Sequence, residues 1–392
     1  MMDYTMQRYD SLWELDPMPD NYSEVLDVLN SDFRTFGEAL INLIEKKAGK
    51  PIDDPIAYLK EVCKSAEIKI SEIASENTLR NWFKKDLRPK KGEDSRRKMF
   101  ALAFALGLTT QETCELFHKA YLDRAFNQRN YKELIYYYCI GKNLSFAHAE
   151  AMIEKVNIDD SVSTDKTMRT ALIVDETSRI NDDDALLEYI HAHSHNFSKN
   201  NTSAKAIAGK WKEKAFYFAQ QQYKRKKLLK EAAENEGGKG AGKDIWNNSI
   251  FYGKNQKSDS FLYSMLTNRN MAGITGTQVV TLKNAVLPDE IKKNFPQVKS
   301  LADNVDSYEE LRKVIILLFS YCFWNEGVPV ECDTDDKYDE YTMQLDMLLQ
   351  QANMPPLYYG NPYDWLFLYC TMSDQPLDTF QGILAQVLED EE

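Results

Sequence analysis

Residues 96–108 read RRKMFALAFALGL, and this stretch decides the fold class. From Met99 onward its side chains are apolar almost without interruption, a pattern that predicts a helix buried on all sides. Gly107 stands where that helix should end. Thr109 precedes Glu112 by three residues, which is the spacing of a capping box at the start of another helix. Strand signals are scarce elsewhere, so we expect an all-α, multi-helix protein.

The composition is that of a protein with two or three domains and sizeable cores. The chain has 392 residues, and 43% of them are hydrophobic. Its formal net charge of −13 argues against a general affinity for nucleic acid or for an anionic membrane surface. Any contact with nucleic acid must therefore come from a local basic patch.

The cysteines and the apolar runs bear on the compartment. Six cysteines occur without CxxC spacing, mostly inside apolar helical patterns, which indicates buried free thiols in a reducing environment. The first residues lack the basic-then-apolar order of a signal peptide. The longest apolar run, at 314–324, is too short to span a bilayer. We expect a cytoplasmic protein that does not contact a membrane.

Three short stretches of the first half recur in the same order in the second half, which suggests an internal repeat. They are LRNWF (79–83), RKMFALAFALG (97–107) and 115–139, which match IKKNF (291–295), RKVIILLFSYC (312–322) and 347–370. In this alignment Arg97 and Lys98 match Arg312 and Lys313, and Tyr131 and Leu134 match Tyr363 and Leu366. We expect two related helical halves. The alternative is that two amphipathic stretches match through shared composition.

The repeat and the changes in composition suggest five segments. They are an N-terminal helical extension (1–56), a first helical domain (57–155), a connector with a long basic amphipathic helix (156–235), a Gly/Lys-rich linker (236–250) and a C-terminal helical domain (251–392).

Three motifs imitate functional sites. GGKGAGKD (237–244) nearly matches a phosphate-binding loop, but a charged helical pattern precedes it where a buried strand is needed, and Asp244 replaces the magnesium-binding hydroxyl. HAHSH (191–195) is better explained as a polar helix end than as a metal site. The acidic run DTDDKYDE (333–340) lacks the glycine of a calcium loop, and we interpret it as a solvated loop. The sequence thus predicts no metal, no cofactor and no enzymatic activity.

One basic stretch stands out against the acidic background. Residues 84–98, KKDLRPKKGEDSRRK, hold eight Lys or Arg against three Asp or Glu. Just before it, SENTLRNWF (75–83) predicts a short helix that Ser75 or Asn77 can cap. The order is a short capped helix, a basic turn with a proline, an apolar helix ending in LGL and a threonine-capped helix.

This order resembles the Cro/repressor-like helix-turn-helix family over residues 57–122. Two features depart from the family pattern: the loop after the short helix is longer, and the second family helix has no clear place in 61–74. The resemblance implies that Ser75, Asn77, Thr78, Arg80 and Asn81 face the major groove of DNA, with Arg80 and Asn81 reading bases. It also implies that Lys84, Lys85, Arg88, Lys90 and Lys91 hold phosphates.

The sequence is compatible with two functions. The first is a DNA-binding regulatory protein whose second half senses a signal or oligomerises. The second is a helical protein–protein interaction scaffold without nucleic-acid binding, because basic loops between helices are common solvated surfaces. The second half keeps the helical skeleton but has lost most of the positive charge. We therefore expect duplex DNA as a partner of the first half, and a protein partner or a second copy for the C-terminal half.

Overall fold

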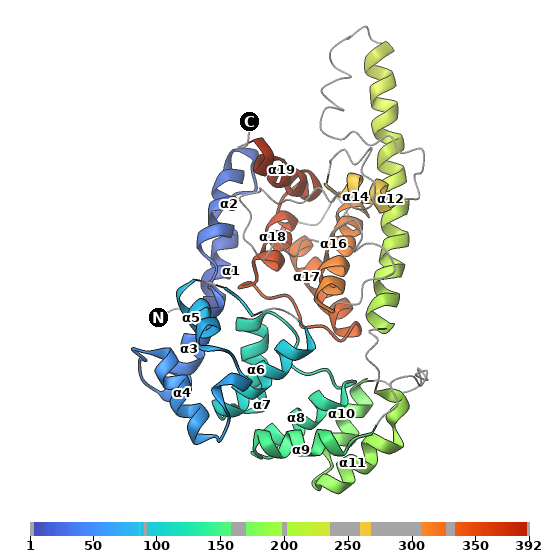
Figure 1. The fold of residues 1–392 in the computed structure, drawn as a ribbon. Helices are drawn as coiled ribbons and strands as arrows, with labels where there is room; N and C mark the ends of the chain where they lie inside the picture. Colours follow the sequence, from blue (N-terminus) through green and yellow to red (C-terminus); the bar gives the residue numbers. More distant parts are fainter. Residues whose placement is uncertain are drawn as a thin grey trace. The chain divides into compact units, whose positions relative to one another are not determined.

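A computed structural model describes residues 4–85, 87–89, 92–157, 170–197, 202–235, 259–267, 308–326 and 334–389. These residues form helices and, within the described ranges, no strand, which confirms the all-α fold class (Figure 1). The chain divides into two compact units. Unit 1 combines Met1–Phe33 with Thr202–Glu392, and unit 2 is Arg34–Asn201. The boundaries expected near 56 and 155 therefore fall inside unit 2.

Unit 2 begins with three helices and a short turn. They are α3 (Phe36–Ala48), α4 (Pro55–Ser65), the 3-10 turn η2 (Ile70–Glu72) and α5 (Glu76–Lys84). Thr35 and Glu38 form a capping box at the start of α3, and the Asp54 carboxylate caps α4 by accepting from two backbone N–H groups. The stretch 61–74, where the sequence offered no clear place for a second family helix, contains the end of α4 and the single turn η2.

The rest of unit 2 is built around the buried helix that the sequence predicts. Its elements are α6 (Glu93–Ala105), α7 (Thr110–Glu115), the π-helix η3 (Leu116–Tyr121), α8 (Tyr131–Gly141), α9 (Phe146–Lys155), α10 (Thr170–Ser178), α11 (Asp183–Ala192) and the 3-10 turn η4 (Ser194–Asn196). Gly107 follows α6 with a φ of 59°, in the left-handed region that favours glycine. The capping box of Thr109 and Glu112 is present. His191 lies in the last turn of α11.

Unit 1 brings the start of the chain against its end. Its elements are α1 (Tyr4–Glu14), the 3-10 turn η1 (Pro19–Asn21), α2 (Tyr22–Ser31), α12 (Thr202–Asn235), α14 (Asp259–Thr267), α16 (Tyr308–Glu326), α17 (Thr334–Gln351), α18 (Pro362–Thr371) and α19 (Pro376–Glu389). The Trp365 indole donates to the Arg8 carbonyl over 3.1 Å, and the Tyr369 hydroxyl donates to the Asp16 carbonyl over 3.0 Å. These bonds fix the N-terminal segment on α18.

Helix α16 forms the centre of unit 1, and every residue from Leu311 to Phe323 is buried. The long helix α12 runs along α16 (Figure 1). The sequence suggested that the acidic run at 333–340 is a solvated loop, and this prediction was wrong. From Thr334 it forms the first turns of α17, where Asp335 and Asp336 lie at the positive end of the helix dipole.

Several expected features lie outside the described residues. These are the linker at 236–250, the motif GGKGAGKD within it, and the IKKNF segment of the proposed repeat. Of the cysteines that the structure describes, Cys63, Cys139, Cys322 and Cys370 are buried free thiols and Cys114 is exposed. Within the described ranges no helix is long and apolar enough to cross a membrane.

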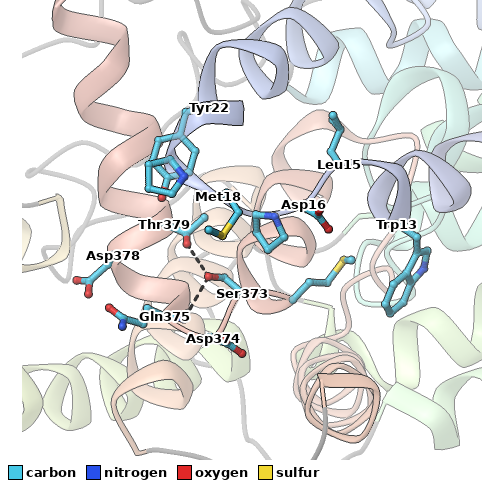
Figure 2. Close-up of a pocket in the computed structure, with 13 residues that line it drawn as sticks. Trp13, Leu15, Asp16, Met18, Tyr22, Ser373, Asp374, Gln375, Asp378 and Thr379 are labelled. Atoms are coloured by element: carbon cyan, nitrogen blue, oxygen red, sulfur yellow. Dashed lines mark hydrogen bonds between the residues drawn. The ribbon is translucent and has the colours of Figure 1, made fainter.

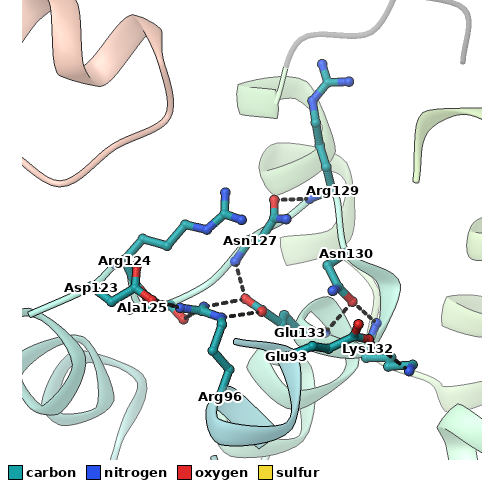
Figure 3. Close-up of polar contacts among 10 residues, drawn as sticks. All are labelled: Glu93, Arg96, Asp123, Arg124, Ala125, Asn127, Arg129, Asn130, Lys132 and Glu133. Carbon is teal, nitrogen blue, oxygen red and sulfur yellow. Dashed lines mark hydrogen bonds and ion pairs between the residues drawn. The ribbon is translucent and has the colours of Figure 1, made fainter. Parts of the chain in front are cut away.

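Each unit contains a buried arginine that ties the central helix to the start of a later helix. In unit 2, Arg96 of α6 donates to both carboxylate oxygens of Glu133 over 2.7 Å each (Figure 3). It also donates to the carboxylate of Asp123 and to the carbonyls of Arg124 and Ala125. Glu133 in turn accepts from the backbone N–H of the residue six positions before it, Asn127, over 2.6 Å.

Unit 1 repeats the main bonds of this arrangement, without a counterpart of the Asp123 carboxylate. Arg312 of α16 donates to both oxygens of Asp364 over 2.7 and 2.8 Å and to the carbonyl of Pro356 over 3.0 Å. Asp364 also accepts from the backbone N–H six positions before it, that of Tyr358. The helices that carry the two carboxylates, α8 and α18, are both capped by an asparagine, Asn130 and Asn361.

The matched bonds fix the register between the two sets of helices. Glu133 corresponds to Asp364, and Arg96, not Arg97, corresponds to Arg312. A residue with positive φ, Leu122 or Asn353, precedes each carboxylate by the same interval. The alignment expected from the sequence is therefore displaced by one residue at both ends, because it followed the Arg-Lys dipeptides and not the arginine that is buried.

Candidate nucleic-acid interface

Helix α5 is held in unit 2 by one apolar face. Leu79 and Trp82 are buried, and the Trp82 ring meets Phe36 of α3 edge-on with centroids 5.1 Å apart. Gly37 allows this approach, since a Cβ at that position would clash with the carbonyl oxygen of Trp82. The Ser75 hydroxyl caps the helix by accepting from the backbone N–H of Thr78. The short helix is thus fixed in both position and start.

The opposite face of α5 carries a polar stripe, which we call the α5 stripe: Asn77, Arg80, Asn81 and Lys84. These positions are spaced so that they share one side of a helix, away from Leu79. Asn77, Arg80 and Lys84 are exposed, and Asn81 is half-buried. Arg80 pairs with Glu76 over 2.7 Å, and Glu76 also pairs with Lys60, which lowers the pKa of its carboxyl. Such exposed pairs contribute little to stability, so Arg80 can leave Glu76 at small cost.

The other residues that the family resemblance implies differ in their exposure and in their hydrogen-bond partners. Ser75 and Thr78 have hydroxyls bonded to each other over 2.8 Å, so they serve the cap. Lys85 is exposed beside Lys84. Arg88 is half-buried and donates to the carbonyl of Ala120 over 3.1 Å. Lys90 and Lys91 lie outside the described residues. The structure therefore brings together the α5 stripe and Lys85, and turns Arg88 toward the protein.

A cavity of about 480 Å³ opens beside the stripe. Its wall is formed by α5, by the residues that follow it and by the first turns of α6, including Asn81, Arg88, Pro89 and Lys98. Polar hydrogen-bonding groups and two cations therefore line a hollow at the edge of the stripe. Lys98 is paired with Asp94 over 2.6 Å, which reduces the positive charge that the hollow presents.

Much of the positive charge that the sequence shows in 84–98 is neutralised inside unit 2. Arg96 belongs to the buried network with Glu133 and Asp123. Arg97 pairs with Glu72 over 2.8 Å and with Glu150 over 2.6 Å. Unit 2 as a whole holds 26 Lys or Arg and 26 Asp or Glu, so the entire excess of acid belongs to unit 1. Unit 2 is therefore neutral as a whole, and its 84–98 stretch presents less unpaired positive charge than the sequence alone suggests.

A cavity in unit 1 is larger than the one beside the α5 stripe and is lined by acidic and apolar side chains. It measures about 790 Å³, and the turn between α18 and α19 lines it together with the segment that joins α1 to α2 (Figure 2). Asp16, Asp374 and Asp378 face it beside Trp13 and Met18. Three carboxylates disfavour phosphate groups, so this cavity is no candidate for nucleic acid.

The sequence missed the buried network that joins α6 to the start of α8. Its partners, Arg96, Asp123 and Glu133, are far apart in the chain and come from three different segments. The available signal was the cap pattern, an asparagine three residues before an acid, in NYKE (130–133) and NPYD (361–364). Within the described residues no group of three or more His, Cys, Asp or Glu side chains could hold a metal ion.

Comparisons with known proteins add no family assignment. No protein-family model, no curated protein and no solved structure matches this chain.

Proposed function

We propose that unit 2 binds duplex DNA through the α5 stripe, and that the chain is a DNA-binding regulatory protein. The observation that carries the proposal is the polar stripe of exposed Asn77, Arg80 and Lys84 with half-buried Asn81, on a capped helix whose other face is anchored by Leu79 and Trp82. Arginine and asparagine are the side chains that read guanine and adenine edges in the major groove. Lys84 and Lys85 at the end of α5 supply phosphate contacts.

Binding is tested by fluorescence anisotropy of the full chain with a pool of random duplexes and with the sites selected from that pool. Each phosphate contact contributes roughly 0.9 to the slope of log affinity against log salt. Changing both Lys84 and Lys85 to Ala should weaken binding to all duplexes alike and reduce that slope by about two. The matched control removes two exposed lysines elsewhere in unit 2, Lys50 and Lys155, and should leave the slope unchanged.

Base reading is tested separately. Arg80→Ala or Asn81→Ala should reduce affinity for the selected site by about 1–3 kcal/mol and leave random duplexes nearly unaffected. Glu76→Gln removes the negative charge beside Arg80 and should strengthen binding to every duplex. No binding to any duplex at low salt would reject the proposal.

An interaction scaffold without nucleic acid is the second candidate. The observation in its favour is the balance of 26 cationic and 26 acidic residues in unit 2, together with the internal pairing of Arg96 and Arg97. DNA-binding domains more often carry a net positive charge. The same titration separates the two functions, because the scaffold predicts no duplex binding at any salt concentration.

A further inference from the structure

The two matched sets of helices differ at the helix that precedes the buried carboxylate, because another helix packs on it in unit 2 but, among the described residues, not on the same face in unit 1. The helix before each buried carboxylate is α7 continued by η3 in unit 2, and α17 in unit 1. Each closes with a hydrogen bond from the residue after the positive-φ position, Asp123 N to Phe117 O and Met354 N to Leu349 O. Phe117 therefore corresponds to Leu349. Counting back along both helices, Glu112, Glu115 and Leu116 correspond to Gln344, Met347 and Leu348.

In unit 2 this face is covered by a helix. Helix α3 packs against η3, Lys46 pairs with Glu115 over 3.0 Å, and Lys47 pairs with Glu112 over 2.8 Å. Leu116 is completely buried. The equivalent face of unit 1 therefore has an apolar position, Leu348, flanked by Gln344 and Met347, whose counterparts pair with lysines in unit 2.

In unit 1 the same face is open. Met347 is 54% exposed, Met343 on the preceding turn is 53% exposed, and Leu348 is only partly buried. Asp336 and Glu340 continue this side toward the start of α17, and both are exposed. We call Asp336, Glu340, Met343 and Met347 the α17 stripe. Methionine adapts its shape to an incoming surface, and exposed methionines in a row are typical of helix-binding surfaces.

Helix α12 presents a complementary stripe. Tyr217, Gln221, Lys224 and Leu228 have the same spacing as the members of the α17 stripe, and all four are exposed. Tyr217 is 59% exposed and Leu228 is 65% exposed, values unusual for large apolar side chains of a soluble protein. Lys224 gives this α12 stripe a positive charge, and the sequence around it reads KRKK at 224–227. In contrast, α17 carries five acidic residues and one lysine.

We propose that the α17 stripe binds the α12 stripe of a second copy of this chain. The order of charges sets the direction of the contact. Basic residues follow Tyr217 along α12, whereas acidic residues precede Met347 along α17, so an antiparallel pairing with Tyr217 against Met347 brings opposite charges together. In that register Lys224 meets Glu340, and Tyr217 meets Met347. A two-fold dimer makes the contact twice, once with each copy's α12.

Sedimentation velocity of the full chain over a range of protein concentrations tests the dimer, and no DNA is present. The proposal does not rest on DNA binding. Wild type should form a dimer that weakens as salt is added, because part of the contact is electrostatic. Met347→Lys should weaken the dimer at least about tenfold. Met6→Lys, at a position of α1 that is 51% exposed, is the matched control and should leave it intact.

A charge exchange identifies the partner surface. Lys224→Glu alone and Glu340→Lys alone should each weaken the dimer, and the chain that carries both changes should regain it, since each contact is then restored with reversed sign. All these positions are exposed, so circular dichroism should show unchanged helix content in every variant. A chain that stays monomeric at every concentration, or a dimer that survives Met347→Lys, would overturn the proposal. So would failure of the doubly exchanged chain to recover.

Discussion

The two buried arginines use the same backbone groups but have different carboxylate partners. In unit 2, Arg96 contacts two carboxylates, Glu133 and Asp123. In unit 1, Met354 occupies the position of Asp123, and Arg312 depends on Asp364 alone for a bidentate partner. Removing one partner of a buried pair leaves an uncompensated charge, so the number of carboxylates decides how much each network can lose. Unit 1 has the less tolerant network.

The largest expected effect comes from breaking the network that has one carboxylate. Asp364→Ala should destabilise unit 1 by about 3–5 kcal/mol, because Arg312 is left buried with carbonyl partners only. Glu133→Ala should destabilise unit 2 by about 1–3 kcal/mol, since Asp123 still compensates Arg96. Hydrogen exchange of peptides from α18 and from α8 measures each unit separately during urea unfolding. Equal losses in the two units would contradict this account.

Truncating a side chain to alanine should cost much more stability on the covered face of η3 than on the open face of α17. Leu116 is fully buried under α3, so Leu116→Ala should cost unit 2 about 2–4 kcal/mol. Met347 stands at the neighbouring position of the open face and is 54% exposed, so Met347→Ala should change the stability of monomeric unit 1 by no more than about 0.5 kcal/mol. Urea titration at low protein concentration, below dimer formation, makes the comparison. A large loss in Met347→Ala would show that the α17 face is already packed in the monomer.

Local signals in the sequence predicted much of the fold. The apolar run after Met99, the glycine at 107, and the caps at Ser75, Thr109 and Asn361 each depend on residues within one or two helical turns, and each is present. Helix α12 was likewise expected from its periodicity. These features follow from propensity and capping, which a sequence carries directly.

The features that could not be predicted from the sequence depend on contacts between residues that lie far apart in the chain. Arg96 and Arg97 are adjacent and chemically identical, and only the fold decides that Arg96 is buried with Glu133. The chain returns its first 33 residues to unit 1 through bonds such as that from Trp365 to Arg8. The acidic run became helical because its carboxylates stabilise a helix start, whereas composition alone suggested a loop. The residues of the α5 stripe were named from the expected short helix and the family resemblance, but the pairing of Arg96 and Arg97 with distant carboxylates could not be predicted.

A smaller effect is expected at the contact that positions α5. Gly37→Ala should cost unit 2 about 1–3 kcal/mol, because the added Cβ clashes with the carbonyl of Trp82 and the two helices must separate. Gly209→Ala in α12 is the matched control, since nothing lies within 4 Å of a Cβ there, and it should stabilise unit 1 by about 0.4–1 kcal/mol. Thermal unfolding with hydrogen exchange of α5 and α12 peptides measures both changes. Destabilisation by both variants would indicate a general intolerance and not a close α3–α5 contact.

The smallest expected effect is a pH dependence confined to the covered face. The Lys47 ammonium and the backbone N–H of Thr109 lower the pKa of Glu112, whose counterpart on α17 is the non-titrating Gln344. A carboxyl with a depressed folded pKa contributes stability above its unfolded pKa, and that contribution is lost as the pH falls through the folded value. Glu112 is partly exposed, so the contribution should not exceed about 1 kcal/mol.

Glu112→Gln should therefore reduce the loss of stability of unit 2 between neutral and acid pH by up to that amount, whereas Gln344→Ala should leave the acid dependence of unit 1 unchanged. Urea midpoints measured across this pH range with α3 and α17 exchange peptides provide the comparison, and an unaltered acid dependence in Glu112→Gln would assign the effect to other carboxylates.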